Sequence, residues 1–155
     1  MDAVRIAWGT GTGPTELAAY DAALADANLQ DYNLVTVSSV VPAGVEVEQV
    51  GTAPDLGTAG ERLHVVQARA TVDGPGEVVA ALGWATGEDA GVVYEATGGS
   101  EAAVRDELAA GLAAGSELRD RTMDEREFRV VSADGEPDCA TAAVVVAAFG
   151  RGDPI

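Results

Sequence analysis

The chain has 155 residues, and its formal net charge at pH 7 is −17, from 26 acidic and 9 basic residues. Every basic residue is arginine, and lysine is absent. This charge argues against nucleic acid and anionic membranes as partners, because both are polyanions, and it favours a cationic small molecule. The negative charges of such a surface repel one another at low salt. In molar salt the Debye length falls to about 3 Å, and this repulsion is screened. We therefore expect a halophilic protein, the alternative being an acidic mesophilic one.

Further bulk properties bear on domain count and compartment. The length fits one domain, residues 1–155. No apolar run approaches the roughly 20 residues that span a bilayer, and the N-terminus lacks a basic-then-apolar signal pattern. The one cysteine excludes an intrachain disulfide, which suits a reducing compartment. The sequence therefore predicts a single cytoplasmic domain without a membrane partner.

The first half of the chain alternates predicted strands with one helix. Residues 4–8 predict a strand and residues 9–13 a glycine-rich loop, after which Pro14 opens a helix that runs to about residue 28. A β-branched run predicts a strand at 34–41, which Pro42 ends. A short strand at 45–50 and a loop rich in Gly, Ala and Thr at 51–60 follow.

The second half is dominated by strands. Ser100 is placed to cap the N-terminus of a second helix. The last strand is apolar on both faces, so we expect it to be central and covered. Few helices and many strands predict a layered α+β domain and not a doubly wound one. The elements are strands at 63–71, 77–86 and 91–95, a helix at 100–118, and strands at 127–133 and 139–149.

Two adjacent serines, Ser38 and Ser39, stand near the end of the strand predicted at 34–41. A hydroxyl at the taut end of a strand is able to attack the carbonyl before it, here that of Ser38, and backbone strain of about 1–3 kcal/mol would drive this step. The resulting ester eliminates across the Cα–Cβ bond of Ser39, which breaks the chain and leaves dehydroalanine. Hydrolysis of dehydroalanine gives a pyruvoyl group. The alternative is an ordinary pair of polar residues.

The segment 33–42, which reads NLVTVSSVVP, resembles the processing site of pyruvoyl-dependent arginine decarboxylases. That family has the pattern Asn-Leu-hydrophobic-x-hydrophobic-Ser-Ser-hydrophobic-x-Pro. Residues 16–24 look like its N-terminal helix, 91–95 like its glutamate-bearing strand, and 139–143 like its small-residue C-terminal strand. The resemblance covers nearly the whole chain, although only the Ser-Ser segment is a specific motif.

The resemblance implies a four-layer αββα sandwich that processes itself into a beta chain, 1–38, and an alpha chain, 39–155. It implies a covalent pyruvoyl cofactor derived from Ser39, to which the amine of L-arginine condenses as a Schiff base. The reaction would convert arginine to agmatine and CO₂ in polyamine biosynthesis. Family members assemble as trimers, sometimes paired into hexamers, with sites between subunits, so Asp21 and Ser39 of one site would come from different subunits.

Three further residues are implicated in the site. The strand-end position of Glu95 predicts a desolvated carboxyl, and the resemblance makes it the proton donor to Cα after CO₂ leaves. The resemblance assigns Asp21 to the guanidinium of the substrate, since a carboxylate and a guanidinium form two parallel charge-assisted bonds. It places Asn33 in the site, either at the oxyanion of the acyl shift or at the substrate. Without the resemblance, these residues read as a surface acid, a solvated helix residue and a turn residue.

Other chemistries find less support. The run at 9–14 resembles a dinucleotide loop, but Pro14 stands where the third glycine belongs. His64 is the only histidine, and no metal-ligand spacing is present. Cys139 reads as a small buried hydrophobe. Three alternatives stay open: a pyruvoyl decarboxylase of another amino acid, a ligand- or nucleotide-binding protein that never cleaves itself, and a family member that cleaves without turnover.

Overall fold

The structure, a computed structural model, describes residues 1–155 and contains nine strands and two helices. They form a five-stranded sheet of order β2-β5-β9-β1-β4 and a four-stranded sheet of order β3-β7-β6-β8. The elements are β1 (Ala3–Gly13), α1 (Glu16–Asp26), β2 (Asn33–Thr36), β3 (Val40–Val41), β4 (Glu46–Gly51), β5 (Arg62–Asp73), β6 (Gly76–Thr86), β7 (Gly91–Gly98), α2 (Glu101–Arg119), β8 (Glu125–Gly135) and β9 (Ala140–Phe149).

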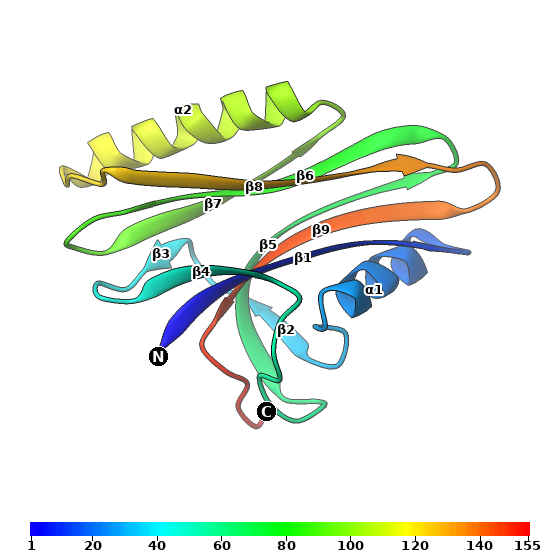
Figure 1. Cartoon of the computed structure of the whole chain (residues 1–155), viewed down its shortest axis with the longest axis horizontal. Helices are drawn as coiled ribbons and strands as arrows, with labels where there is room; N and C mark the ends of the chain where they lie inside the picture. The colour runs from blue at the N-terminus through cyan, green and yellow to red at the C-terminus, as the bar shows by residue number, and fades with distance from the viewer.

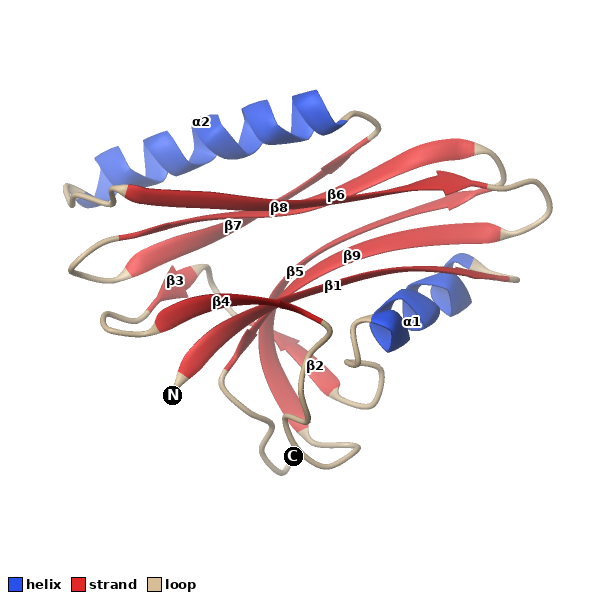
Figure 2. Ribbon diagram, viewed as in Figure 1, coloured by secondary structure: helices blue, strands red, loops and turns tan.

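The two sheets stack face to face, and each carries one helix on its outer face (Figure 1). Helix α1 packs on β1, β9 and β5, and α2 packs on β7, β6 and β8. A cluster of 14 buried residues fills the space between the sheets. Figure 2 shows the resulting order of helix, sheet, sheet and helix. The prediction of an α+β sandwich is confirmed.

Strand β9 lies in the middle of the five-stranded sheet, and all ten of its residues are buried. It pairs with β1 on one side and with β5 on the other, antiparallel in both cases. Val144 and Val146 face the helix α1, whereas Val145 and Ala147 face the second sheet. Both faces of the strand are therefore covered, which explains its unbroken apolar sequence.

The glycine-rich run after residue 8 is strand and not loop, so that prediction was wrong. Strand β1 continues to Gly13, and Gly9, Gly11 and Gly13 lie under α1. A Cβ on Gly11 would lie 2.5 Å from the backbone nitrogen of Ala23, closer than real Cβ atoms approach other atoms. The alternating glycines thus let the helix rest directly on the strand backbone, a close approach that local composition does not reveal.

Both helices begin at side-chain caps. The Thr15 hydroxyl accepts from the backbone N–H of Ala18, and Ser100 accepts from Ala103 at 3.3 Å, as predicted for Ser100. Helix α1 is shorter than predicted, because the chain turns left-handed at Asn28 (φ 60°) after the C-cap. Helix α2 likewise ends at Asp120, where φ is 48°. Neither helix is long and apolar enough to span a membrane.

Candidate active site

The two serines lie where the chain crosses from one sheet to the other. The predicted strand at 34–41 is broken in two: β2 belongs to the five-stranded sheet, whereas β3 belongs to the four-stranded sheet. Ser38 and Ser39 fall between them, outside both ladders. The prediction of one continuous strand was therefore wrong, because a run of β-branched residues does not show to which sheet each half belongs.

Each side of the crossing is held by one backbone hydrogen bond. The Val37 N–H donates to the Val65 carbonyl in β5 at 3.0 Å, and the Val93 N–H in β7 donates to the Ser39 carbonyl at 2.8 Å. The peptide between Ser38 and Ser39 makes no backbone hydrogen bond of its own. Ser38 is exposed and Ser39 is half-buried. The crossing therefore presents an unengaged peptide bond between two fixed flanks.

The backbone angle φ is not positive at Ser38 or Ser39. The residues other than glycine that have positive φ are Asn28, Asp120 and Asp138. Neither Ser38 nor Ser39 is among them, so left-handed backbone does not supply the strain expected there from the sequence. What distinguishes this peptide is the anchoring of its two ends in different sheets.

Glu95 lies close to Ser39 in the register of the four-stranded sheet. Strand β3 pairs with β7 through Val40 and Val92, and the bond from Val93 to the Ser39 carbonyl continues this pairing by one residue. Glu95 is two residues beyond Val93, so both side chains point to the same face of β7, toward the other sheet. Within one chain the Glu95 carboxylate is exposed, and the desolvation expected for it is absent.

Asp21 lies on the outer side of α1. The buried face of this helix consists of Ala19, Tyr20, Ala23 and Leu24, and Asp21 points away from it into solvent. Leu17, one turn before, is 69% exposed. The Asp21 carboxylate makes no ion pair within the chain, since the three pairs present involve Asp2, Asp153 and Glu101.

Asn33 begins β2, and its side-chain amide holds the preceding loop. Nδ2 donates to the Gly60 carbonyl at 2.8 Å, while the Asn33 backbone N–H donates to the Glu61 carbonyl. Six residues of extended chain separate Asn33 from Ser39, about 20 Å. The two residues therefore do not meet within one chain, and Oδ1 of Asn33 stays available as an acceptor.

Opposite Asn33 in the ladder stands Arg62, which is held by the C-terminal segment. The Arg62 Nε donates to Asp153 Oδ1 at 2.7 Å, and the backbones of these two residues also exchange hydrogen bonds. The hydrogen bond and the charge of Arg62 lower the pKa of the Asp153 carboxyl below its ordinary value. This pair fixes the strand end next to Asn33.

Other candidate residues take no part in this region. His64 is half-buried in β5, and no group of three His, Cys, Asp or Glu side chains comes together to hold a metal. Cys139 is half-buried beside Glu136, and burial together with that carboxylate raises the pKa of its thiol. The contribution that sequence reasoning missed is that of Val93, whose amide holds Ser39; only the strand register reveals it.

Two features of the structure characterise this class of protein: an αββα arrangement of layers and a Ser-Ser peptide without backbone hydrogen bonds between the two sheets. The family model for "Pyruvoyl-dependent arginine decarboxylase (PvlArgDC)" matches residues 3–154. The chain is 48% identical over 157 aligned positions to the pyruvoyl-dependent arginine decarboxylase of Halobacterium salinarum, covering 100% of this chain and 98% of the relative. It is 32% identical to that of Thermococcus kodakarensis, covering 88% and 89%. The chain belongs to the pyruvoyl-dependent arginine decarboxylase family.

Proposed function

We propose that this chain cuts itself between Ser38 and Ser39 and then decarboxylates L-arginine to agmatine and CO₂. The observation that carries the proposal is the unengaged Ser38–Ser39 peptide, anchored on each side in a different sheet, in a member of this family. The relatives named above are decarboxylases of arginine by name. Decarboxylation of another amino acid, or binding without cleavage, has no such support.

The cleavage step uses groups of this chain alone. The Ser39 hydroxyl attacks the Ser38 carbonyl carbon, the peptide nitrogen leaves, and an ester joins the two residues. Removal of the Ser39 α-proton then breaks the Cβ–O bond, expels the Ser38 carboxylate and leaves dehydroalanine at position 39. Water converts this dehydroalanine to a pyruvoyl group, with release of ammonia. Because the Ser38 carbonyl accepts no backbone hydrogen bond, it is free to rotate toward the hydroxyl.

Both products keep their places in the fold. The beta chain, 1–38, retains β1 and β2 with their pairing to β9, β4 and β5. The alpha chain, 39–155, retains β3 against β7 and the bond from Val93 to the residue 39 carbonyl. Cleavage therefore releases the two new ends from each other without opening either sheet.

The residues around position 39 fit a pyruvoyl group. Ser39 is half-buried, its carbonyl is held by Val93, and the face of β7 beside it carries Glu95. A pyruvoyl group here supplies a carbonyl that traps the substrate amine and accepts electrons as CO₂ leaves. The amide of Val93 keeps that position fixed, and Glu95 is placed to give a proton to the substrate Cα.

A second subunit would complete the site. Strand β2 covers β5 only as far as Val65, and β3 covers β7 only as far as Val92, so both sheets have unpaired edges on the side of Ser39. Long unpaired edges invite pairing or covering by another chain. A homotrimer, or a dimer of trimers, would cover them and remove Glu95 from water, which its role as a proton donor requires.

The substrate contacts would come from Asp21 and Asn33. The Asp21 carboxylate has no internal partner and lies beside the exposed Leu17, an arrangement suited to an intersubunit site that holds a guanidinium. The Oδ1 atom of Asn33 is free to accept from the same substrate, while its Nδ2 atom keeps the residue in place. The acid excess and the absence of lysine support a high-salt cytoplasm, where agmatine would enter polyamine biosynthesis.

Denaturing gels and a CO₂ assay test the proposal. We expect protein purified in high salt to give two chains and to release CO₂ from L-arginine faster than from other amino acids. Ser39→Ala should stay intact and inactive, whereas Ser132→Ala, an exposed strand serine far along the chain, should cleave normally. One intact chain would point to a binding protein, two chains without CO₂ to an inactive member, and CO₂ from another amino acid to a different substrate.

A further inference from the structure

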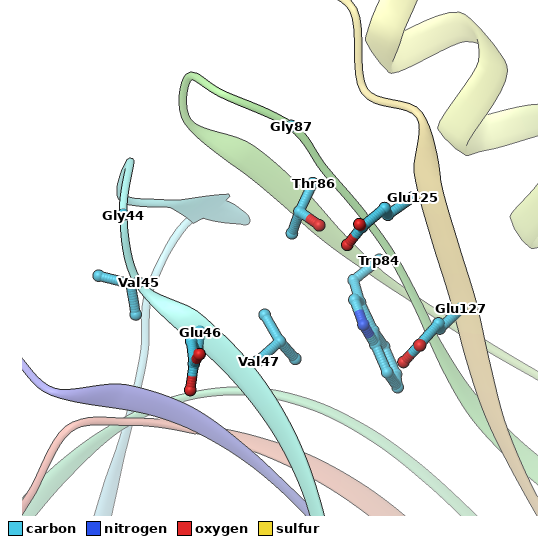
Figure 3. A pocket seen from close by; sticks show the side chains of 9 residues that line it. All are labelled: Gly44, Val45, Glu46, Val47, Trp84, Thr86, Gly87, Glu125 and Glu127. Atoms are coloured by element: carbon cyan, nitrogen blue, oxygen red, sulfur yellow. The ribbon is translucent and has the colours of Figure 1, made fainter.

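A cavity of about 520 Å³ opens at the edge of the sandwich that lies opposite β2 and β3. It lies between the start of β4, an edge strand of one sheet, and the adjoining ends of β6 and β8 in the other sheet (Figure 3). Trp84, Thr86, Glu125 and Glu127 line its wall in the four-stranded sheet, and the start of β4 with the preceding Gly44 and Val45 lines the facing wall. The cavity is thus separate from the Ser39 crossing.

The same edge is closed immediately beside the cavity. Arg129 of β8 reaches across to the other sheet, where its guanidinium lies 4.0 Å from the ring centroid of Trp8 and its Nε donates to Gln49 Oε1 at 2.8 Å. Two residues earlier in β8 stands Glu127, which makes no ion pair. Arg129 thus joins the two sheets, and at Glu127, which has no such contact, the space between the sheets opens into the cavity.

The wall of the cavity carries a hydrogen-bond donor that has no acceptor within the chain. Trp84 is only 3% exposed, and Figure 3 shows its indole nitrogen on the side of the ring that faces β4 across the cavity. The hydrogen bonds of aromatic side chains in this chain belong to Tyr20, Tyr32 and Tyr94, and the indole N–H of Trp84 has none. Nε1 is not among the buried polar atoms that lack a partner, so the indole N–H is open to the cavity. It is therefore free to donate to an acceptor that binds there.

Two carboxylates stand in register on this wall. Glu127 pairs with Trp84, and Glu125 pairs with Thr86, so all four side chains share the inner face of the sheet. The two carboxylates are two residues apart on one strand, which separates them by about 7 Å. No arginine lines the cavity. Glu46 alternates with two valines that pack into the core between the sheets, so its side chain points the other way.

We infer that this cavity binds a basic amino acid at a second site, distinct from Ser39. The carboxylates of Glu125 and Glu127 pair with its two cationic groups, and the indole N–H of Trp84 and the hydroxyl of Thr86 donate to its α-carboxylate. A diamine offers no acceptor to the Trp84 N–H, and an alkali ion uses neither donor. Trp84 also pairs with Val93, whose amide holds Ser39, so the two sites are one strand apart.

Trp84 itself serves as the reporter, since the chain has two tryptophans. The Trp8→Phe change removes the other one and keeps a ring beneath Arg129. Ser39→Ala is combined with it, so that no substrate is consumed. Indole fluorescence is followed while L-arginine, agmatine or KCl is added at constant high ionic strength. Calorimetry on the same protein counts the bound ligands.

We expect a saturable change with L-arginine, weakened at least about tenfold by Glu127→Gln, because a charge-assisted bond is lost. Glu77→Gln, a strand glutamate at the far end of β6, should leave the affinity unchanged, and Glu127→Gln should also remove one bound arginine by calorimetry. The inference is overturned if agmatine gives the same fluorescence change as L-arginine, or if KCl gives it. It is also overturned if Glu127→Gln binds L-arginine as tightly as the parent protein does. Because Ser39→Ala is used, these results do not depend on the proposed reaction.

Discussion

The contact between β1 and α1 makes a quantitative prediction for Gly11→Ala. The added Cβ would lie 2.5 Å from Ala23 N and 2.7 Å from the Ala22 carbonyl carbon, and both are backbone atoms that cannot rotate away. Overpacking of this kind costs about 1–3 kcal/mol, and the cost at Gly11 belongs in the upper half of that range. Alanine also restricts the unfolded chain more than glycine does, which stabilises the folded state by about 0.4–1 kcal/mol. The net loss is about 1–2.6 kcal/mol.

For a chain of this size, 1 kcal/mol shifts Tm by about 2–4 °C, so Gly11→Ala should lower Tm by about 2–10 °C. The assay is thermal unfolding followed by circular dichroism at one fixed high salt concentration. Gly99→Ala is the matched control, because the nearest atom to its Cβ would be 3.9 Å away. If Gly11→Ala melts together with Gly99→Ala, then α1 does not rest on the β1 backbone and the reasoning is refuted.

Three further predictions concern chemistry and pH. Glu95→Gln should cleave normally but turn over at least about 100-fold more slowly, since it loses the proton donor; normal turnover would remove Glu95 from the mechanism. Asp21→Asn should raise KM for arginine far more than it changes the rate of cleavage, and an unchanged KM would place the guanidinium contact elsewhere. The lowered pKa of Asp153 means that its bond to Arg62 stabilises the fold above the ordinary value of 3.8 and is lost as pH falls through the folded pKa. Asp153→Asn should therefore lower Tm at neutral pH and match the parent chain in strong acid; a constant difference across a pH series of melts would contradict this.

Local signals predicted much of the fold correctly. The apolar run at the C-terminus indicated a covered central strand, and β9 is buried along its whole length. Ser100 indicated a helix start, and its hydroxyl caps α2. These features depend on neighbours in the sequence and on side-chain periodicity, which a single sequence contains.

Features that depend on distant partners were not predictable in the same way. Nothing near Gly11 shows that a helix will lie on it, so its run reads as a loop. The β-branched residues around Ser39 favour a strand but do not show that the strand changes sheets there. The nearness of Glu95 to Ser39 follows from the pairing of β3 with β7, and the exposure of Glu95 follows from the point at which β3 ends, which the sequence does not show.

The proposed activity depends on one event, in which the peptide between Ser38 and Ser39 breaks and leaves a ketone. Intact-mass measurement of the folded protein, purified in high salt, tests it most directly. We expect two masses, those of residues 1–38 and 39–155, with the longer chain lacking a free α-amine and reacting with a hydrazine. A single mass for the uncut 155-residue chain, inert to the hydrazine, would contradict it.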